Sequence, residues 1–228
     1  MKKKLLLSWS TGKDSAWCLH LLRQQSDYEI AGLLTTLNAE FDRVAMHSTR
    51  RALLDRQAEA AGLPLIAVPL PWPCSNADYE QIMAGVCRSA AEQGVTAIAF
   101  GDLFLDDIRA YRERQLQGTG LEPVFPLWQI PTHQLAQEMI SGSLRAKLVC
   151  VDPKKVPSSF AGRDFDRQLL ADLPPGVDPC GENGEFHTCV YAGPMFSREI
   201  PIQCGERAQR DGFCFCDLLP ASVSLSPT

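Results

Sequence analysis

The stretch LLLSWSTGKDSAWCLHLL, residues 5–22, decides the fold, because it passes from a buried strand through one short turn into a helix. Its first residues are an apolar run of strand length, and a helix is expected from Asp14 onward. The turn between them brings together backbone N–H groups at a helix N-terminus, the Lys13 ammonium, and the hydroxyls of Ser8, Ser10, Thr11 and Ser15. This turn is either a phosphate-binding loop or an ordinary strand-to-helix turn in which Ser10 or Asp14 caps the helix.

Two familiar phosphate loops do not match the turn. A Walker A loop would need glycine at position 7 and Ser or Thr at position 14, where the chain has Leu7 and Asp14. A dinucleotide-binding fingerprint would need several glycines, and Gly12 stands alone. A phosphate site in this turn must therefore belong to another class.

The order strand, then helix, recurs through the first half of the chain. Apolar runs with little polar alternation predict buried strands over residues 4–9, 30–37, 64–70 and 95–100. Helices are predicted over residues 14–25, 48–61, 76–93 and 105–116, with Ser or Asn at starts and Gly62 and Gly94 after two of the ends. This order predicts an α/β fold with a doubly wound parallel sheet.

The pattern changes after a proline-rich interruption. We place a domain boundary within residues 121–128, which gives a first domain of residues 1–128 and a smaller α+β domain of residues 129–228. The second domain is expected to contain a helix at 132–141, a strand at 147–151, and a helix from Ser158 or Ser159 to Leu173. Because ligands of such sheets bind beyond the carboxyl ends of the strands, the expected site is a cleft between the two domains.

Composition limits the classes of function. The 228 residues are 45% hydrophobic and 21% charged, and no apolar run is long enough to span a membrane. The start MKKKLLLSW has no cleavage site, so we expect a cytoplasmic N-terminus and not a secretory signal. The net charge of −5 argues against a nucleic-acid partner, and the one modest basic stretch, RRALLDR at 50–56, is interpreted as the solvated face of a helix.

The cysteines favour reduced thiols. Nine cysteines are an odd number, and they show neither regular spacing nor a CxxC pair, so neither a disulfide framework nor a metal site is expected. In GFCFCDLL, residues 212–219, strand alternation would put Phe213 and Phe215 on one face and both thiols on the other.

A second candidate site lies near the C-terminal end of the chain. Glu182 and Glu185 flank Asn183-Gly184 and follow Gly181, which places two carboxylates on a tight turn. Such a pair can orient ammonia, hold a magnesium ion or accept a proton. The alternative is a surface turn with solvated glutamates.

Four segments resemble known proteins. Residues 10–15, STGKDS, resemble the SGGxDS pyrophosphate loop (PP-loop) of the N-type ATP pyrophosphatases. Thr11 stands where that motif has its first glycine, so the match predicts that residue 11 does not need a positive φ. Residues 45–65, residues 101–128 and DPCGENGEFHTCVYAGPMF at 178–196 resemble the diphthine ammonia ligase family of that superfamily. With a Gly-Arg element at 162–163, the resemblance covers residues 4–196 in matching order and spacing.

The resemblance implies an adenine nucleotide alpha hydrolase-like fold of the HUP type, with ATP and Mg²⁺ as cofactors. A substrate carboxylate would attack the α-phosphate of ATP and release pyrophosphate, and ammonia would then displace AMP to form an amide. In this family the acceptor is a modified histidine of translation elongation factor 2, so a protein of that kind would be the partner. Free ammonium would be the nitrogen source, because no glutaminase domain is visible.

The resemblance also assigns roles to residues. The catalytic residues would be Lys13, Asp14, Glu182 and Glu185. ATP would be bound by Ser8, Ser10, Thr11, Gly12, Lys13, Asp14, Ser15, Thr35, Thr36, Gly101 and Asp102. The acceptor would be bound by Met46, His47, Arg109, Glu113, Arg163, Cys180, Gly181, Gly184 and Thr188. No metal ligand is assigned.

The chain departs from the family pattern in one segment. The family's second arginine is Tyr111 here, and its Tyr-Gln pair is Asp107-Ile108. These departures keep open a ligase for a small carboxylic acid in place of a protein acceptor. An enzyme that thiolates RNA and a nucleotide sensor without turnover also remain alternatives, although a sensor would have little use for the turn at 181–185.

Overall fold

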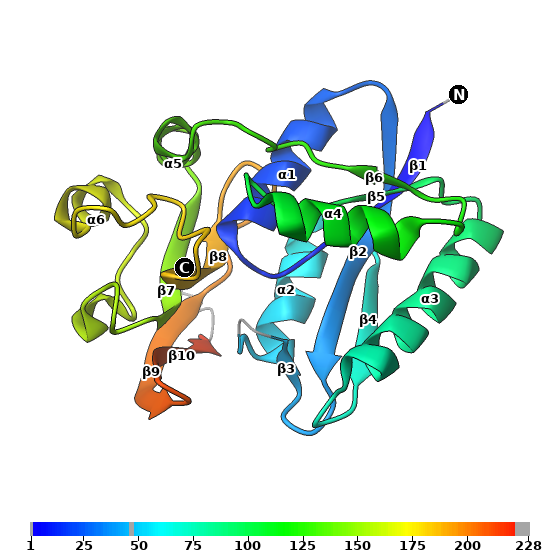
Figure 1. The fold of residues 1–228 in the computed structure, drawn as a ribbon. Helices are drawn as coiled ribbons and strands as arrows, with labels where there is room; N and C mark the ends of the chain where they lie inside the picture. The colour runs from blue at the N-terminus through cyan, green and yellow to red at the C-terminus, as the bar shows by residue number, and fades with distance from the viewer. Residues whose placement is uncertain (1, 46–47, 222–228) are drawn as a thin grey trace, which may run out of the picture.

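The computed structural model describes residues 2–45 and 48–221 (Figure 1). In these residues the strands form a six-stranded sheet in the N-terminal part and a four-stranded sheet in the C-terminal part. The elements in chain order are β1 (Lys3–Ser8), α1 (Lys13–Gln24), β2 (Tyr28–Asn38), β3 (Arg43–Val44), α2 (Arg51–Ala61), β4 (Leu65–Leu70), α3 (Asn76–Glu92), β5 (Ala97–Ala99), α4 (Asp106–Leu116), β6 (Glu122–Val124), α5 (Thr132–Ser141), β7 (Arg145–Val151), the 3₁₀ helix η1 (Ser158–Phe160), α6 (Arg167–Asp172), β8 (Phe186–Ala192), β9 (Ile202–Arg210) and β10 (Phe213–Pro220).

The first sheet is parallel except for one short strand, which confirms the predicted α/β class. β1 lies at its centre between β2 and β5, β4 pairs with β2 and β6 with β5, all in parallel, while β3 runs antiparallel beside the end of β2. Leu5 and Leu7 pack into a core with α1, α2 and the C-terminal sheet, and Leu6 packs into a second core with α3 and α4. Helices on both faces therefore explain the unbroken apolar run of β1.

Glycine and serine signals mark some helix ends as predicted. Ser75 accepts a hydrogen bond from Asp78 N at the start of α3, and Gly62 follows α2 with a φ of 64°. The predicted start of α2 at Ser48 is wrong, because the helix begins at Arg51 after Arg50. Ser48 instead has a φ of 55° and donates its N–H to the carbonyl of Val44, in a turn that follows β3.

The strand β6 and the region after β7 differ from the expectations. β6 lies inside the segment 121–128 that was interpreted as a boundary, and it extends the parallel sheet beside β5. The helix predicted from Ser158 to Leu173 is wrong, because η1 and α6 are separate. Between them Gly162 has a φ of 86° and Phe165 donates its N–H to the carbonyl of Ala146, so this segment pairs locally with β7.

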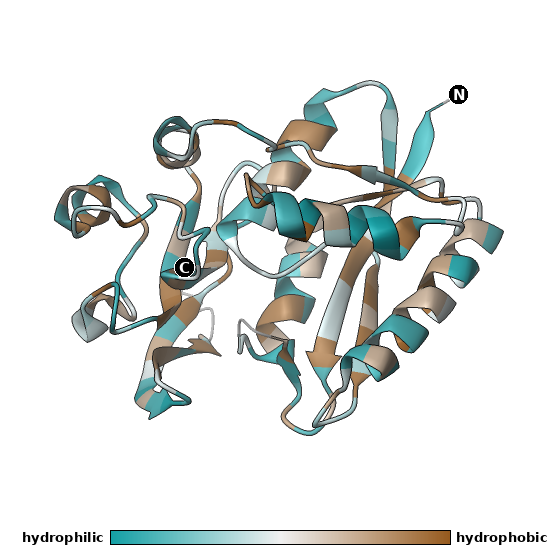
Figure 2. Cartoon of the chain, viewed as in Figure 1, coloured by the Kyte–Doolittle hydropathy of each residue, from teal (hydrophilic) through white to brown (hydrophobic). Residues whose placement is uncertain are grey.

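The second sheet is antiparallel in the order β8-β7-β10-β9. One apolar core joins it to the first sheet, since buried residues of β1 and α1 pack in the same cluster as buried residues of β7 and β8. Figure 2 shows the hydrophobic residues gathered along the strands, whereas α4 is largely hydrophilic. The boundary within residues 121–128 stays a prediction. No helix among the described residues has the length and apolar character needed to cross a membrane.

Arginines in β3 and at the start of α2 bind the C-terminal sheet. Arg43 and Arg50 both form ion pairs with Asp217 of β10, at 2.9 and 2.6 Å. Arg56 donates to the carbonyl of Ala221. The interpretation of residues 50–56 as a solvated helix face is therefore wrong for Arg50 and Arg56, which connect α2 to β10.

Replacing Asp217 tests this connection. Burial opposes ionisation of Asp217, but hydrogen bonds from Arg50 and Arg43 hold its pKa below the usual range. Asp217→Asn should therefore lower the free energy of unfolding at pH 7 by about 1–2 kcal/mol in urea titrations. Because the pKa is depressed in the folded state, the wild type should lose this stabilisation below about pH 4, and the variant should not.

The matched control is Arg51→Ala, which removes an exposed ion pair between Arg51 and Asp55, both on α2. That change should cost no more than about 0.5 kcal/mol. Equal losses in the two variants would contradict a structural role for Asp217.

Candidate functional site

The loop between β1 and α1 is strained at Thr11. Thr11 has a φ of 71°, so the expectation that residue 11 avoids a positive φ is wrong. Its fully buried side chain hydrogen-bonds to the Thr49 hydroxyl at 2.9 Å, and its carbonyl accepts from Val190 N at 3.0 Å and from Gln57 Nε2 at 3.1 Å. These partners hold a conformation that costs a β-branched residue on the order of 1–3 kcal/mol.

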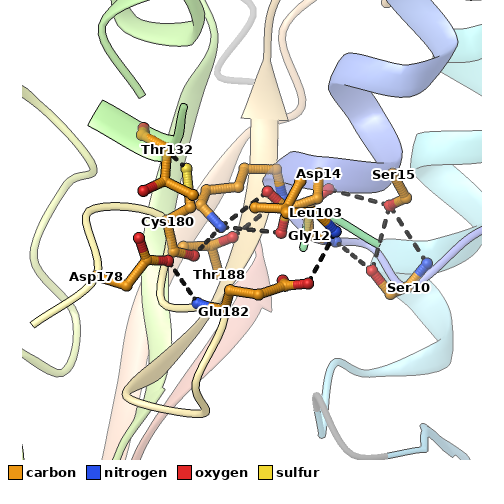
Figure 3. A network of polar contacts seen from close by, with 11 residues as sticks. Ser10, Gly12, Asp14, Ser15, Leu103, Thr132, Asp178, Cys180, Glu182 and Thr188 are labelled. Carbon is orange, nitrogen blue, oxygen red and sulfur yellow. Dashed lines mark hydrogen bonds and ion pairs between the residues drawn. The ribbon is translucent and has the colours of Figure 1, made fainter. Parts of the chain in front are cut away.

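No side chain caps α1. Gly12 is the N-cap residue and has no side-chain cap hydrogen bond, so the alternative in which Ser10 or Asp14 merely caps the helix is wrong. Ser10 and Ser15 instead hydrogen-bond to each other through their hydroxyls at 3.2 Å, and Ser15 Oγ donates to the carbonyl of Gly12 at 3.1 Å (Figure 3). The positive end of the helix dipole therefore has no competing side-chain carboxylate as its cap, which suits an anion site.

Lys13 connects the loop to the C-terminal part of the chain, and Asp14 forms an ion pair with Lys13. Lys13 N donates to Thr188 Oγ1 at 3.0 Å, so the predicted acceptor contact Thr188 positions the loop. The Lys13 ammonium is buried, forms an ion pair with Asp14 at 2.9 Å and donates to the carbonyl of Cys180. Burial works against its charge, but Asp14 raises the pKa of Lys13, so the ammonium stays protonated.

Glu182 reaches from the C-terminal turn to the end of β5. Its carboxylate accepts a hydrogen bond from Leu103 N at 2.8 Å, and its own N–H donates to Asp178 Oδ2 at 2.8 Å (Figure 3). Burial raises the pKa of Glu182 to about 7 despite the Leu103 hydrogen bond, and the negative charges of Asp14 and Asp102 act in the same direction. Near neutral pH this carboxyl group can both give up and accept a proton.

The geometry of the turn requires Gly181. Its φ is 71°, and a Cβ there would lie 2.8 Å from the carbonyl oxygen of Phe186. Gly184 also has a positive φ, of 78°, with open space around it. The predicted acceptor contacts Cys180, Gly181 and Gly184 thus lie in one turn, directly before β8.

Glu185 faces the inside of the same turn. One carboxylate oxygen accepts from Asp178 N and from Asn183 Nδ2, both at 3.2 Å, and the side chain is buried. The other oxygen, Oε2, is buried and has no hydrogen-bond partner among the described residues. The two glutamates therefore differ in their contacts. Glu182 hydrogen-bonds to Leu103, which follows a strand of the parallel sheet, whereas Glu185 hydrogen-bonds to residues of its own turn.

Gly101 and Asp102 lie at the carboxyl end of β5, next to the loop. A Cβ on Gly101 would lie 3.1 Å from both Asp14 C and Ser15 N, so a larger residue would push the backbone of the loop and β5 apart. Asp102 forms an ion pair with Arg112 of α4 at 3.3 Å. Arg112 was not predicted as a site residue. The sequence does contain a signal for it, because Tyr111 stands where the family has its second arginine and Arg112 directly follows Tyr111.

A cleft of about 1090 Å³ opens between the first sheet and helices α3 and α4. Ser8, Ser10 and Thr36 line it from the strand ends, and Tyr111 and Arg112 line it from α4. The cleft thus lies on the α3 and α4 face of the first sheet and not between the two sheets. Its volume and its position at the carboxyl ends of parallel strands are typical of a nucleotide site.

Thr35 does not line this cleft. Its side chain is buried and donates to the carbonyl of Trp9 at 2.8 Å. Because side chains alternate along β2, Thr36 faces the cleft and Thr35 the opposite face. Of these two predicted nucleotide contacts, Thr36 therefore lines the cleft and Thr35 does not.

Three predicted acceptor contacts are held in local pairs. Arg109 pairs with Glu113 at 2.8 Å on α4 and lies over the rings of Phe125 and Trp128. Arg163 pairs with Asp172 at 2.7 Å. Met46 and His47 lie outside the described residues.

Asp178 was not predicted as a site residue, although it is the first residue of the motif DPCGE. Its carboxylate accepts a hydrogen bond from Glu182 N, and its carbonyl accepts one from Gly181 N.

The described residues contain no group of three or more His, Cys, Asp or Glu side chains arranged to hold a metal ion. All nine cysteines are free. Burial raises the pKa of Cys189 to about 12, and it raises the pKa of Cys180 well above the usual range of a thiol. Neither thiol is a ready nucleophile at neutral pH.

The protonation of Glu182 can be measured directly. Its carboxyl ¹³C chemical shift should titrate near pH 7, while most exposed carboxyl groups titrate near 4. Because the folded-state pKa lies above the ordinary value of 4.5, stability should decrease as the pH rises from about 4.5 to 7, and Glu182→Gln should remove this part of the decrease. Asp55→Asn, an exposed control on α2, should keep it; a midpoint near 4.5 for Glu182 would contradict the buried site.

Comparisons with known proteins identify the family. The model of the diphthamide synthase N-terminal domain matches residues 1–123, and that of the C-terminal domain matches residues 131–222. The diphthine–ammonia ligases of Bos taurus and Homo sapiens are 26% and 25% identical over 220 residues, covering 86% of this chain and 82% of each relative. That of Danio rerio is 27% identical, with 86% and 85% covered. The chain belongs to the diphthamide synthase family.

Proposed function

We propose that this protein is an ATP-dependent ligase that converts a carboxylate of its acceptor into an amide, with diphthine on a protein like translation elongation factor 2 as the acceptor. The relatives' name, diphthine–ammonia ligase, supports this activity. In this proposal residues 1–128 bind the nucleotide, residues 129–228 bind the acceptor, and the protein acts in the cytoplasm.

The proposed reaction has two steps. The acceptor carboxylate attacks the α-phosphate of ATP, forming an acyl-adenylate and releasing pyrophosphate. Ammonia then attacks the acyl carbon, and AMP leaves with the C–O bond electrons. Because ammonia is mostly protonated at neutral pH, the second step needs a group that accepts a proton.

The observation that carries this proposal is the position of Glu182. It comes from the C-terminal turn, yet its carboxylate hydrogen-bonds to Leu103 N just beyond β5, close enough to Asp14 and Asp102 to be raised in pKa by their charges. A carboxyl group with a pKa of about 7 can attract ammonium and take its proton at neutral pH. We assign this role to Glu182, and to Glu185 the support of the turn.

The loop at residues 10–15 is assigned to the phosphates. Its hydroxyls and the N-terminus of α1 would stabilise the departing pyrophosphate, and Gly101 keeps β5 close to the loop. The three N–H donors of Lys13 go to both carboxylate oxygens of Asp14 and to the Cys180 carbonyl, so Lys13 must exchange one of these acceptors to reach a phosphate. Until then it holds Asp14 in place.

A magnesium ion fits this donor set only together with ATP. The described residues near the loop include no group of three or more metal-ligating side chains, which suits an ion that is bound by one or two carboxylates plus substrate phosphates. Asp14 would be its protein ligand. When bound, it would neutralise charge on the phosphates.

The fate of ATP tests the reaction class. With α-labelled and γ-labelled ATP, Mg²⁺, ammonium and a diphthine-bearing acceptor, the wild type should form AMP and pyrophosphate together with amide. Asp14→Asn should lower this turnover at least about 100-fold, because it removes the partner of Lys13 and the proposed metal ligand. Asp55→Asn on α2 should leave turnover unchanged.

Other products would contradict the proposal. ADP and phosphate would exclude adenylation, and tight ATP binding without turnover would favour a sensor. Turnover with a small carboxylic acid but not with diphthine would give the enzyme a different acceptor, as the departure at Tyr111 allows. Sulfur transfer to RNA has little support in the motif at 178–196, because Cys180 and Cys189 are buried thiols of raised pKa.

The pH dependence tests Glu182. If its ionised form accepts the proton, amide formation should rise with an apparent pKa near 7. Glu182→Gln should lose this rise and slow amide formation by roughly 10²–10⁴-fold, while acceptor-dependent ATP cleavage should fall much less. Equal loss of both activities would show that Glu182 acts before ammonia enters.

A further inference from the structure

Three thiols gather around the segment 158–162, away from the proposed catalytic groups. Cys214 Sγ donates to Ser158 Oγ at 3.2 Å, and Cys204 Sγ donates to the carbonyl of Gly162 at 3.9 Å. Cys216 Sγ lies 2.9 Å from the place where a Cβ on Gly162 would stand. Cys204 of β9 and Cys216 of β10 therefore meet over the same residue.

A bulge in the ladder brings these two thiols together. Cys216 pairs with Arg207 and Leu218 with Cys204, and the register shifts between them, so that two residues of β9 face the single Asp217. A bulge bends its strand and increases the local twist. Cys204 lies close enough to Cys216 to raise its pKa, and Cys216 Sγ donates to the carbonyl of Asp217 at 3.8 Å.

The two thiols differ in access. Cys204 is exposed, whereas Cys216 is 2% exposed. Burial raises the pKa of Cys216 to about 11, so it is a weak nucleophile at neutral pH. An oxidant from solution therefore meets Cys204 first, with Cys216 directly behind it.

We propose that Cys204 and Cys216 form a disulfide-forming pair that reacts with a small disulfide such as oxidised glutathione. The Cys204 thiolate attacks one sulfur of that molecule, and a glutathione thiolate leaves. Cys216 loses its proton and attacks the Cys204 sulfur, and the second glutathione leaves as thiolate. The two cysteines together lose two electrons and two protons, and one molecule of oxidised glutathione becomes two thiols.

The position of the pair gives the bond a structural consequence. Because Cys204 and Cys216 flank the bulge that carries Asp217, a bond between them would displace Asp217 from its two arginine partners. Asp217 binds Arg43 and Arg50, and Val44 and Ala45, directly after Arg43, line the cleft. Any effect of this change on catalysis rests on the proposed function, whereas formation of the bond does not.

The test is to treat the reduced full-length protein with oxidised glutathione and to map the products by mass spectrometry. The wild type should lose the mass of two hydrogen atoms and yield a peptide pair joined through Cys204 and Cys216. Cys216→Ser should stop at a glutathione adduct on Cys204, and Cys204→Ser should form neither product. Cys214→Ser, on the same strand, is the matched control and should behave as the wild type.

Three results would overturn the proposal. They are a wild type that keeps the glutathione adduct on Cys204, a bond that joins another pair of cysteines, and no reaction at Cys204.

The effect of the bond on Asp217 has its own measurement. Amide hydrogen exchange in residues 48–54 should become faster in the oxidised wild type, as in Asp217→Asn, and should stay unchanged in Cys216→Ser. Unchanged exchange after disulfide formation would disprove the link to Asp217.

Discussion

The candidate site depends on the hydrogen bonds that hold the loop at residues 10–15 to β8. Thr188 Oγ1 accepts from Lys13 N, and the Thr11 carbonyl accepts from Val190 N, both at 3.0 Å. These two contacts join segments far apart in the sequence and fix the strained φ of Thr11. They set the direction in which the N-terminus of α1 points, and so the place where an anion can be bound.

The same strand also carries the second half of the site. β8 starts directly after the turn at residues 178–185, so a fixed distance along the chain separates the anchor at Thr188 from Glu182. The strand that holds the loop therefore also delivers a carboxylate to the end of β5, where Leu103 N binds it. Neither half of the chain contains this arrangement alone, and the apolar core that the two sheets share packs the two halves against each other.

The parallel sheet could be predicted because its signals are local. Buried strands such as β1 are apolar throughout, Ser75 caps α3 with its side chain, and Gly62 follows α2 in a left-handed conformation. The positive φ of Thr11 could not be predicted, because distant partners stabilise it. The break between η1 and α6 has the same origin, since pairing with β7 overrides the helical pattern of residues 158–173.

The site was predicted as a set of residues but not as an arrangement. Loop, turn and the end of β5 do meet, but the motif could not show that Glu182 and Glu185 face different surroundings, or that Thr36 and not Thr35 faces the cleft. Strand alternation could have separated the two threonines if the exact register of β2 had been known. Arg112 was missed because its ion pair with Asp102 depends on how α4 lies against β5.

The most direct test of the account is the exchange of labelled pyrophosphate into ATP, measured without ammonium in the presence and absence of a diphthine-bearing acceptor. A reversible adenylation at the loop predicts exchange that requires the acceptor, persists in Glu182→Gln and disappears in Asp14→Asn. No exchange by wild-type protein that does form the amide once ammonium is added would contradict an acyl-adenylate formed with release of pyrophosphate from this loop. Exchange that needs no acceptor would contradict attack of the acceptor carboxylate on the α-phosphate.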